Sequence, residues 1–147
     1  MEKPSKFKST RIANFGLSRA ERWLLEAKDA QIAKRYDNAV YCSQMCVEQA
    51  AKAILIALGI EYPREHDVSE EFRTLSTRIG VPEWFKRKLD HLSDGISELA
   101  KLRGLAGYGF EKGMTPEYFE EYSQTALGTA EHFLSSCKRL FKEIVRT

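Results

Sequence analysis

Apolar residues recur along most of the chain at intervals of three and four positions, which is the spacing of one face of an α-helix. The first such segment begins at Ser18, where Glu21 three positions later completes a capping box, and ends near Lys34 and Arg35. The second segment runs from Asp37–Asn38 to Leu58, with Gly59 as its stop signal. These two segments predict two long consecutive helices.

Three further helices are predicted downstream. Asp67 caps a short helix with an apolar stripe that extends to Ile79 and is closed by Gly80. Pro82 opens a fourth helix and Pro116 a fifth, because proline is favoured in the first helical turn. The fifth carries a long apolar face made of Phe119, Tyr122, Ala126, Ala130, Phe133, Cys137, Leu140 and Ile144. Five helices with short links predict an all-α fold, an up-and-down four-helix bundle with an extra short helix.

The fourth helix raises a question about one arginine. Its apolar stripe consists of Phe85, Leu89, Leu92, Ile96 and Leu99, and the next step of four lands on Arg103. A buried, unpaired guanidinium costs several kcal/mol, so Arg103 either meets a carboxylate or faces a wet cleft. The alternative is an arginine at a helix end with its stem packed and its head in water. Gly104, Gly107 and Gly109 follow, and they predict that the backbone unwinds or approaches something closely.

Composition narrows the class of protein. The chain has 147 residues, 43% of them hydrophobic and 30% charged, which suits one soluble domain. Residues 1–16 hold Lys3, Lys6, Lys8 and Arg11 against Glu2, so we expect a basic N-terminal arm followed by a helical domain over 17–147. The near-neutral remainder argues against a protein that coats nucleic acid, and we expect no DNA partner. With no long apolar run and no signal-peptide pattern, we expect no membrane partner and a cytoplasmic protein.

A family resemblance rests on the stretch AKDA…RYDNAVYCSQ…VEQAAKA over Ala27–Ala53, followed by His66-Asp67 at the start of the short helix. The chain resembles the HEPN domain over roughly residues 17–145. The resemblance implies a homodimer whose copies face each other across a cleft lined by the fourth-helix motif. It also implies a possible partner, a minimal nucleotidyltransferase, in a toxin–antitoxin-like pair.

The resemblance also identifies candidate site residues. Active ribonucleases of the family share an arginine followed, after four to six residues, by a histidine. Arg103 matches the arginine, but Tyr108 stands where the histidine is expected. Tyrosine, with an unperturbed pKa near ~10, is a poor base, and losing a general acid–base group typically costs about 10²–10⁴ in rate. We therefore expect Arg103 and Tyr108 to bind nucleotide or RNA phosphate. The alternatives are a metal-independent ribonuclease that uses Tyr108 or His66 instead, and an adaptor dimer without ligand.

Four other residues match family positions. Glu48 and Lys52 form an intrahelical ion pair or, in the functional interpretation, contribute to the phosphate site with Glu48 holding Arg103 across the bundle. His66 and Asp67 are expected to have structural roles, with His66 orienting the loop. The sequence contains no HExxH or phosphate-loop pattern, so we expect no metal and no cofactor.

Two expectations concern association and modification. The second helix is apolar on nearly every side, which indicates either a central position or an interface, and we expect a tight dimer. In toxin pairs of this family a tyrosine near the arginine motif is adenylylated by the partner, two residues after the histidine. That position here is Phe110, so packing of Tyr108 near Arg103 is favoured over its modification.

Overall fold

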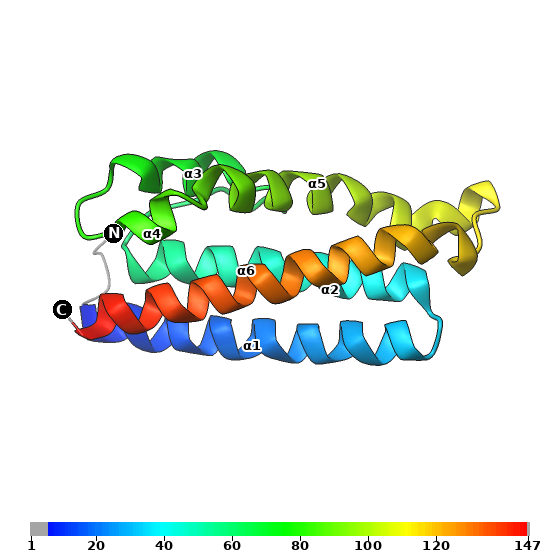
Figure 1. Ribbon diagram of the computed structural model, residues 1–147, viewed down its shortest axis with the longest axis horizontal. Coiled ribbons are helices and arrows are strands. Elements are labelled where there is room, and N and C mark those ends of the chain that lie inside the picture. Colours follow the sequence, from blue (N-terminus) through cyan, green and yellow to red (C-terminus); the bar gives the residue numbers. More distant parts are fainter. Residues whose placement is uncertain (1–5, 147) are drawn as a thin grey trace.

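The computed structural model describes residues 6–146, and every regular element among them is helical. Four long helices lie alongside one another, and each runs opposite to the long helix before it in the chain, so that the start of the first and the end of the last lie at the same end of the bundle (Figure 1). They are α1 (Lys6–Ile32), α2 (Tyr36–Ala57), α5 (Leu89–Tyr108) and α6 (Glu120–Arg146). The predicted all-helical class is confirmed.

The short elements differ in number from the prediction. They are α3 (Ser69–Arg73), α4 (Glu83–Lys86) and the 3-10 turns η1 (Thr74–Thr77), η2 (Gly109–Lys112) and η3 (Pro116–Phe119). The described residues thus form six α-helices and three 3-10 helices rather than five helices. The predicted short helix stops early because its stripe does not continue inward: Ile79 is 97% exposed, and Gly80 has a φ of +93° that ends the turn.

The start of the first helix was wrongly predicted. α1 begins at Lys6, twelve positions before Ser18, which lies inside the helix and caps nothing. The reason is packing, because Ala13 and Leu17 are buried and continue the apolar stripe toward the N-terminus. The basic residues Lys8 and Arg11 therefore belong to α1, whereas Lys3 lies outside the described residues. The division between arm and domain stays a prediction.

The helix ends are close to their predicted positions. α1 ends at Ile32 rather than at Lys34–Arg35, because Lys34 adopts a φ of +62° and turns the chain into α2. Gly59, with a φ of +71°, follows the end of α2 as predicted. Gly16 of α1 lies so close to α2 that a Cβ at this position would be 3.0 Å from the Cβ of Ala53. Small residues therefore set the spacing of this helix pair.

α2 is the central helix, which explains its composition. It packs against α1, α5 and α6, and its buried apolar residues include Val40, Val47 and Ile54. The surface that the sequence assigned to an interface is therefore covered within one chain, and it is no evidence for a dimer. The dimer itself stays a prediction.

The glycines near Arg103 do not unwind the backbone. α5 continues through Gly104 and Gly107 to Tyr108, and Gly109 has an ordinary helical φ of −59°. After Tyr108 the backbone leaves the α-helix and forms the 3-10 helix η2, and it turns at Gly113, whose φ is +80°. Close approach is the correct part of the prediction: a Cβ at Gly107 would lie 3.6 Å from the ring of Tyr41 on α2. Small residues let α5 pack closely on α2 beside Arg103.

Candidate functional site: a polar network between α2 and α5

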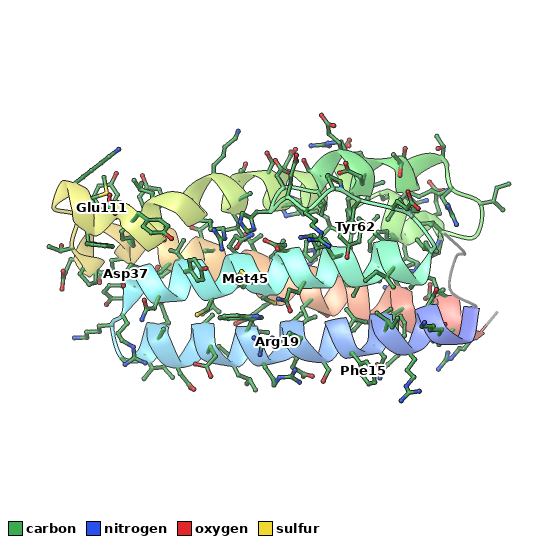
Figure 2. The ribbon with its side chains drawn as sticks, turned by 180° about the vertical axis from the view of Figure 1, so that it is seen from behind. Phe15, Arg19, Asp37, Met45, Tyr62 and Glu111 are labelled. Carbon is green, nitrogen blue, oxygen red and sulfur yellow. The ribbon has the colours of Figure 1, made fainter. Side chains whose placement is uncertain are left out.

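Arg103 projects from α5 onto α2 and is partly buried there. Its Nε donates a hydrogen bond to Gln44 Oε1 at 3.1 Å, and its Nη2 donates to the Tyr41 hydroxyl at 2.8 Å. Its guanidinium carbon lies 4.8 Å from the centroid of the Tyr41 ring. Figure 2 views the molecule from the side on which α2 and α5 lie next to each other, and labels Tyr62 beside them. Arg103 is thus held in one orientation by two residues of α2.

The partners of Arg103 begin a polar strip along α2. Tyr41, Gln44, Glu48 and Lys52 are spaced by three, four and four residues, so they lie on one face of the helix. Most of the remaining side chains of α2 are buried in the core, and the strip is the face that meets α5 and the loop after α2. The strip therefore carries polar groups on three consecutive turns of a largely apolar helix.

Glu48 is the centre of this network. The residue is 7% exposed, and its Oε1 accepts hydrogen bonds from Gln44 Nε2 at 2.9 Å and from His66 Nδ1 at 2.8 Å. Its Oε2 accepts from Lys52 Nζ at 3.1 Å. Burial by itself would raise the pKa of Glu48, but the hydrogen bonds from Gln44, Lys52 and His66 outweigh it and the pKa lies below its ordinary value. Glu48 therefore stays ionised.

Glu48 acts on Arg103 through an intermediary. The expected direct contact between the two is absent, and Gln44 joins them by donating to Glu48 and accepting from Arg103. The intrahelical ion pair of Glu48 with Lys52 is present as predicted. The buried amide of Gln44 therefore fixes the position of the Arg103 guanidinium without neutralising its charge.

The charge of Arg103 remains available to a ligand. Both of its hydrogen-bond partners are neutral, and within residues 8–146 no carboxylate forms a salt bridge with it. A guanidinium has five N–H donors in a planar fork, and these two bonds use two of them. An arginine with free donors, held by neutral groups, is suited to binding phosphate or another oxyanion.

Tyr108 is not brought to Arg103. Five residues of helix separate the two positions, which turns Tyr108 about 140° around α5 from Arg103. Its ring is 63% exposed. The tyrosine that touches Arg103 is Tyr41 instead.

The His66–Asp67 pair lies at the other end of the strip. His66 has a half-exposed side chain, and beside it Lys52 Nζ lies 5.5 Å from the centroid of the Tyr62 ring. Asp67 Oδ1 accepts a hydrogen bond from the Ser69 backbone N–H at 2.9 Å. Burial would raise the pKa of Asp67, but its hydrogen bonds and the nearby Lys101 hold the pKa below its ordinary value. Asp67 thus anchors the start of α3, while His66 reaches back to Glu48.

The sequence analysis did not identify the two residues that contact Arg103, Tyr41 and Gln44. Gln44 belongs to the polar strip that stands out on an otherwise apolar helix, so its position was a usable signal. Tyr41 carries no such signal, because a tyrosine in a helix is ordinary core material. Only the packing of α5 on α2 brings it to Arg103.

Within residues 6–146, no three histidine, cysteine or acidic side chains are grouped so that they could hold a metal ion. None of the helices described is long and apolar enough to cross a membrane.

Comparisons with known proteins place the chain in a family. The sequence model of the HEPN domain matches residues 13–140. A protein of Methanocaldococcus jannaschii named "Putative toxin MJ1304" is 34% identical over 138 residues, which cover 90% of each chain. No solved structure matches the chain significantly. The match spans nearly the whole helical domain, including Tyr41, Gln44, Glu48 and Arg103, and the chain therefore belongs to the HEPN domain family.

Proposed function

We propose that this protein is a toxin-like HEPN protein that binds the phosphate of RNA or of a nucleotide through Arg103. The observation that supports it is the way Arg103 is held, by the neutral groups of Tyr41 and Gln44 and without a paired carboxylate. Lys52 adds a second cation on the same strip. The name of the Methanocaldococcus relative supports the toxin-like assignment.

The proposed assembly is a homodimer of up-and-down bundles that works with a minimal nucleotidyltransferase. It rests on the family resemblance, in which two copies place their arginine motifs at a shared cleft. A dimer would put two copies of Arg103 along one ligand, and two linked sites bind far more tightly than one. Light scattering at micromolar concentration tests the dimer, and a monomer mass would contradict it.

Binding is tested with a 5′-fluorescein-labelled single-stranded RNA by fluorescence anisotropy. Arg103→Ala is expected to weaken binding by about tenfold or more, because a charge-assisted, bidentate contact is lost. Arg22→Ala is the matched control, since Arg22 lies on the exposed side of α1 and, among the described residues, hydrogen-bonds only to Ser18. Equal losses in both variants would reduce the interaction to general electrostatics and contradict an Arg103 site.

A second candidate function is RNA cleavage with His66 as the base. The observation that favours it is the 2.8 Å contact between His66 Nδ1 and Glu48 Oε1. When Nδ1 carries the proton and donates it to Glu48, Nε2 is left as the basic nitrogen of a half-exposed ring. In this reaction Nε2 accepts the proton of the ribose 2′-OH as the 2′-oxygen attacks phosphorus. The 5′-oxygen leaves and takes a proton from water, a 2′,3′-cyclic phosphate forms, and Arg103 stabilises the negative charge.

Cleavage is tested by incubating the same RNA with protein in chelator. Products that disappear in His66→Ala and Arg103→Ala, but persist in the control His91→Ala, would support the His66 base. Cleavage that survives in His66→Ala and is lost in Tyr108→Phe would assign the base to Tyr108 instead. No cleavage by any protein would leave phosphate binding as the function.

A further inference from the structure

A second surface of the molecule lies on the other side of α5, between α5 and α6. The two helices approach closely at one level, where a Cβ at Gly95 would lie 3.1 Å from the Thr129 Cγ2. α6 runs obliquely to α5, and the two make few other contacts (Figure 1). From that level toward η3 they enclose an open groove of about 800 Å³. We call it the α5–α6 groove.

The α5–α6 groove exposes part of the apolar stripe of α6. Tyr122 belongs to that stripe and was expected in the core, yet it is 45% exposed because no helix covers it. Tyr118 of η3 is 49% exposed, and its ring centroid lies 5.9 Å from that of Tyr122. Leu102 and Ala126 complete the apolar lining. A contiguous apolar lining at the surface, left without an intramolecular partner, is typical of an interaction site.

The charge of the groove is acidic. Glu98, Glu117, Glu120 and Glu121 line it, and Lys101 is the one cation among its lining residues. Within the described part of the chain, only Glu120 of the four has a hydrogen bond or salt bridge, from the Tyr36 hydroxyl at 3.3 Å. The remaining carboxylates face solvent around the two tyrosines. The groove is therefore lined by apolar side chains together with exposed carboxylates.

We propose that the α5–α6 groove binds a basic, amphipathic segment of a partner polypeptide. Lysine or arginine side chains of the segment meet the glutamates, and its apolar side chains cover Tyr118 and Tyr122. The groove extends along α5 from Gly95 to Leu102, about 10 Å at 1.5 Å per residue, which matches two turns of a helix. This site is separate from Arg103 and does not depend on the function proposed for it.

The negative charge of the α5–α6 groove argues against two other occupants, RNA and a second copy of the chain. RNA phosphate is repelled by the four glutamates. A second copy that used the same groove would place the acidic side chains of both copies against each other. A basic polypeptide is the occupant whose charge complements the groove.

The probe is a fluorescein-labelled 14-residue peptide of lysine and leucine with its leucines on one helical face, measured by anisotropy at physiological salt. A peptide of the same composition with its leucines scattered around the helix controls for net charge. The amphipathic peptide is expected to bind about tenfold more tightly than the scattered one. The double substitution Glu117→Lys, Glu121→Lys is expected to weaken its binding by about tenfold or more, because charge repulsion replaces attraction. Arg103→Ala is expected to leave it unchanged.

Three results would overturn the proposal. The first is equal binding of the two peptides, which would mean attraction by net charge alone. The second is unchanged binding to the Glu117→Lys, Glu121→Lys variant, provided that its thermal melt matches that of the unsubstituted protein. The third is a dimer in light scattering that the same double substitution converts to a monomer, because the groove would then hold a second copy of the chain.

Discussion

Arg139 and Arg103 both lie against aromatic rings, and they are held in opposite ways. Arg139 on α6 has its guanidinium carbon 3.8 Å from the Trp84 ring centroid, and its Nε lies 3.6 Å from Glu143 Oε1. Trp84 Nε1 also donates to Glu143 Oε2 at 2.8 Å. Arg103 lies against Tyr41 but is bonded only to the Tyr41 hydroxyl and the Gln44 amide. The first arginine is paired with a carboxylate, and the second is not.

The difference separates a structural contact from the proposed binding site. In the Trp84 cluster, the charge of Arg139 is satisfied by Glu143, and the result is that α4 is attached to α6. In the Arg103 network the carboxylate, that of Glu48, is already shared by Lys52, His66 and Gln44. The guanidinium is therefore positioned but not neutralised. Both arginines have an aromatic partner, so what distinguishes Arg139 from Arg103 is the paired carboxylate.

The largest expected effect is a loss of stability. It should be greater in the buried Glu48 network than in the partly exposed Trp84 cluster. Glu48→Ala leaves the polar groups of Gln44 and Lys52 without their partner in a buried place, and it is expected to cost about 3 kcal/mol. Glu143→Ala removes a partly exposed carboxylate and is expected to cost about 1 kcal/mol or less. Urea unfolding measures both. Similar losses would contradict the view that only the Glu48 network is buried and interdependent.

Exchanging each arginine for lysine comes next. Lysine keeps the charge but loses the planar fork, so Arg103→Lys is expected to weaken RNA binding by about tenfold. Arg139→Lys is expected to leave RNA binding unchanged, because Glu143 already occupies this guanidinium. The anisotropy assay measures both proteins side by side. If the Arg139 variant were the weaker binder, the phosphate site would have been assigned to the wrong arginine.

Removing one polar atom from each aromatic partner gives a smaller effect. Tyr41→Phe keeps the ring but removes the hydroxyl that accepts from Arg103, and it is expected to weaken RNA binding by about fivefold, or about 1 kcal/mol. Trp84→Phe removes the bond to Glu143 and is expected to lower stability by about 1 kcal/mol without changing RNA binding. Anisotropy and urea unfolding together decide this pair. RNA affinity that is unchanged in Tyr41→Phe would show that the hydroxyl does not position Arg103.

The smallest expected effect is a pH dependence of stability. The pKa of folded Glu48 is lower than its ordinary value of 4.5. Its contribution to stability is therefore complete above that value and is lost as the pH falls through the folded pKa. Urea unfolding between pH 6 and about pH 3 is expected to show a smaller loss of stability in Glu48→Gln than in the unsubstituted protein. Asp67 titrates in both proteins, so the difference reports on Glu48, and identical slopes would contradict its lowered pKa.

The sequence determined the elements that depend on local pattern. The 3–4 spacing of apolar residues specified the all-helical class, and Gly59 and Pro116 marked an end and a start, because φ preferences act within a single turn. The placement of Arg103 in line with a core stripe indicated an unusual environment. The polar strip through Gln44, Glu48 and Lys52 was visible for the same reason.

The tertiary structure decided what lies opposite each of these positions. Ser18 and Glu21 form a good capping pattern, but the burial of Ala13 and Leu17 against neighbouring helices extends α1 past it. Tyr122 fits the stripe of α6 and is still exposed, because it lines the open groove between α5 and α6. These outcomes depend on the distance and angle between helices. Both are set by packing between side chains that are far apart in the sequence.

In the candidate site, too, part of the arrangement follows from the sequence and part only from the tertiary structure. From the sequence we predicted that Tyr108 packs near Arg103, but five positions of helix turn it to another side of α5, where Tyr108 is exposed. The sequence selected Arg103, but its partner Tyr41 is 62 positions away and is defined only by the packing of α5 on α2. The sequence determines which side chains are present. The hydrogen bonds to neutral groups, which leave the charge of Arg103 unpaired, form only when α5 packs on α2.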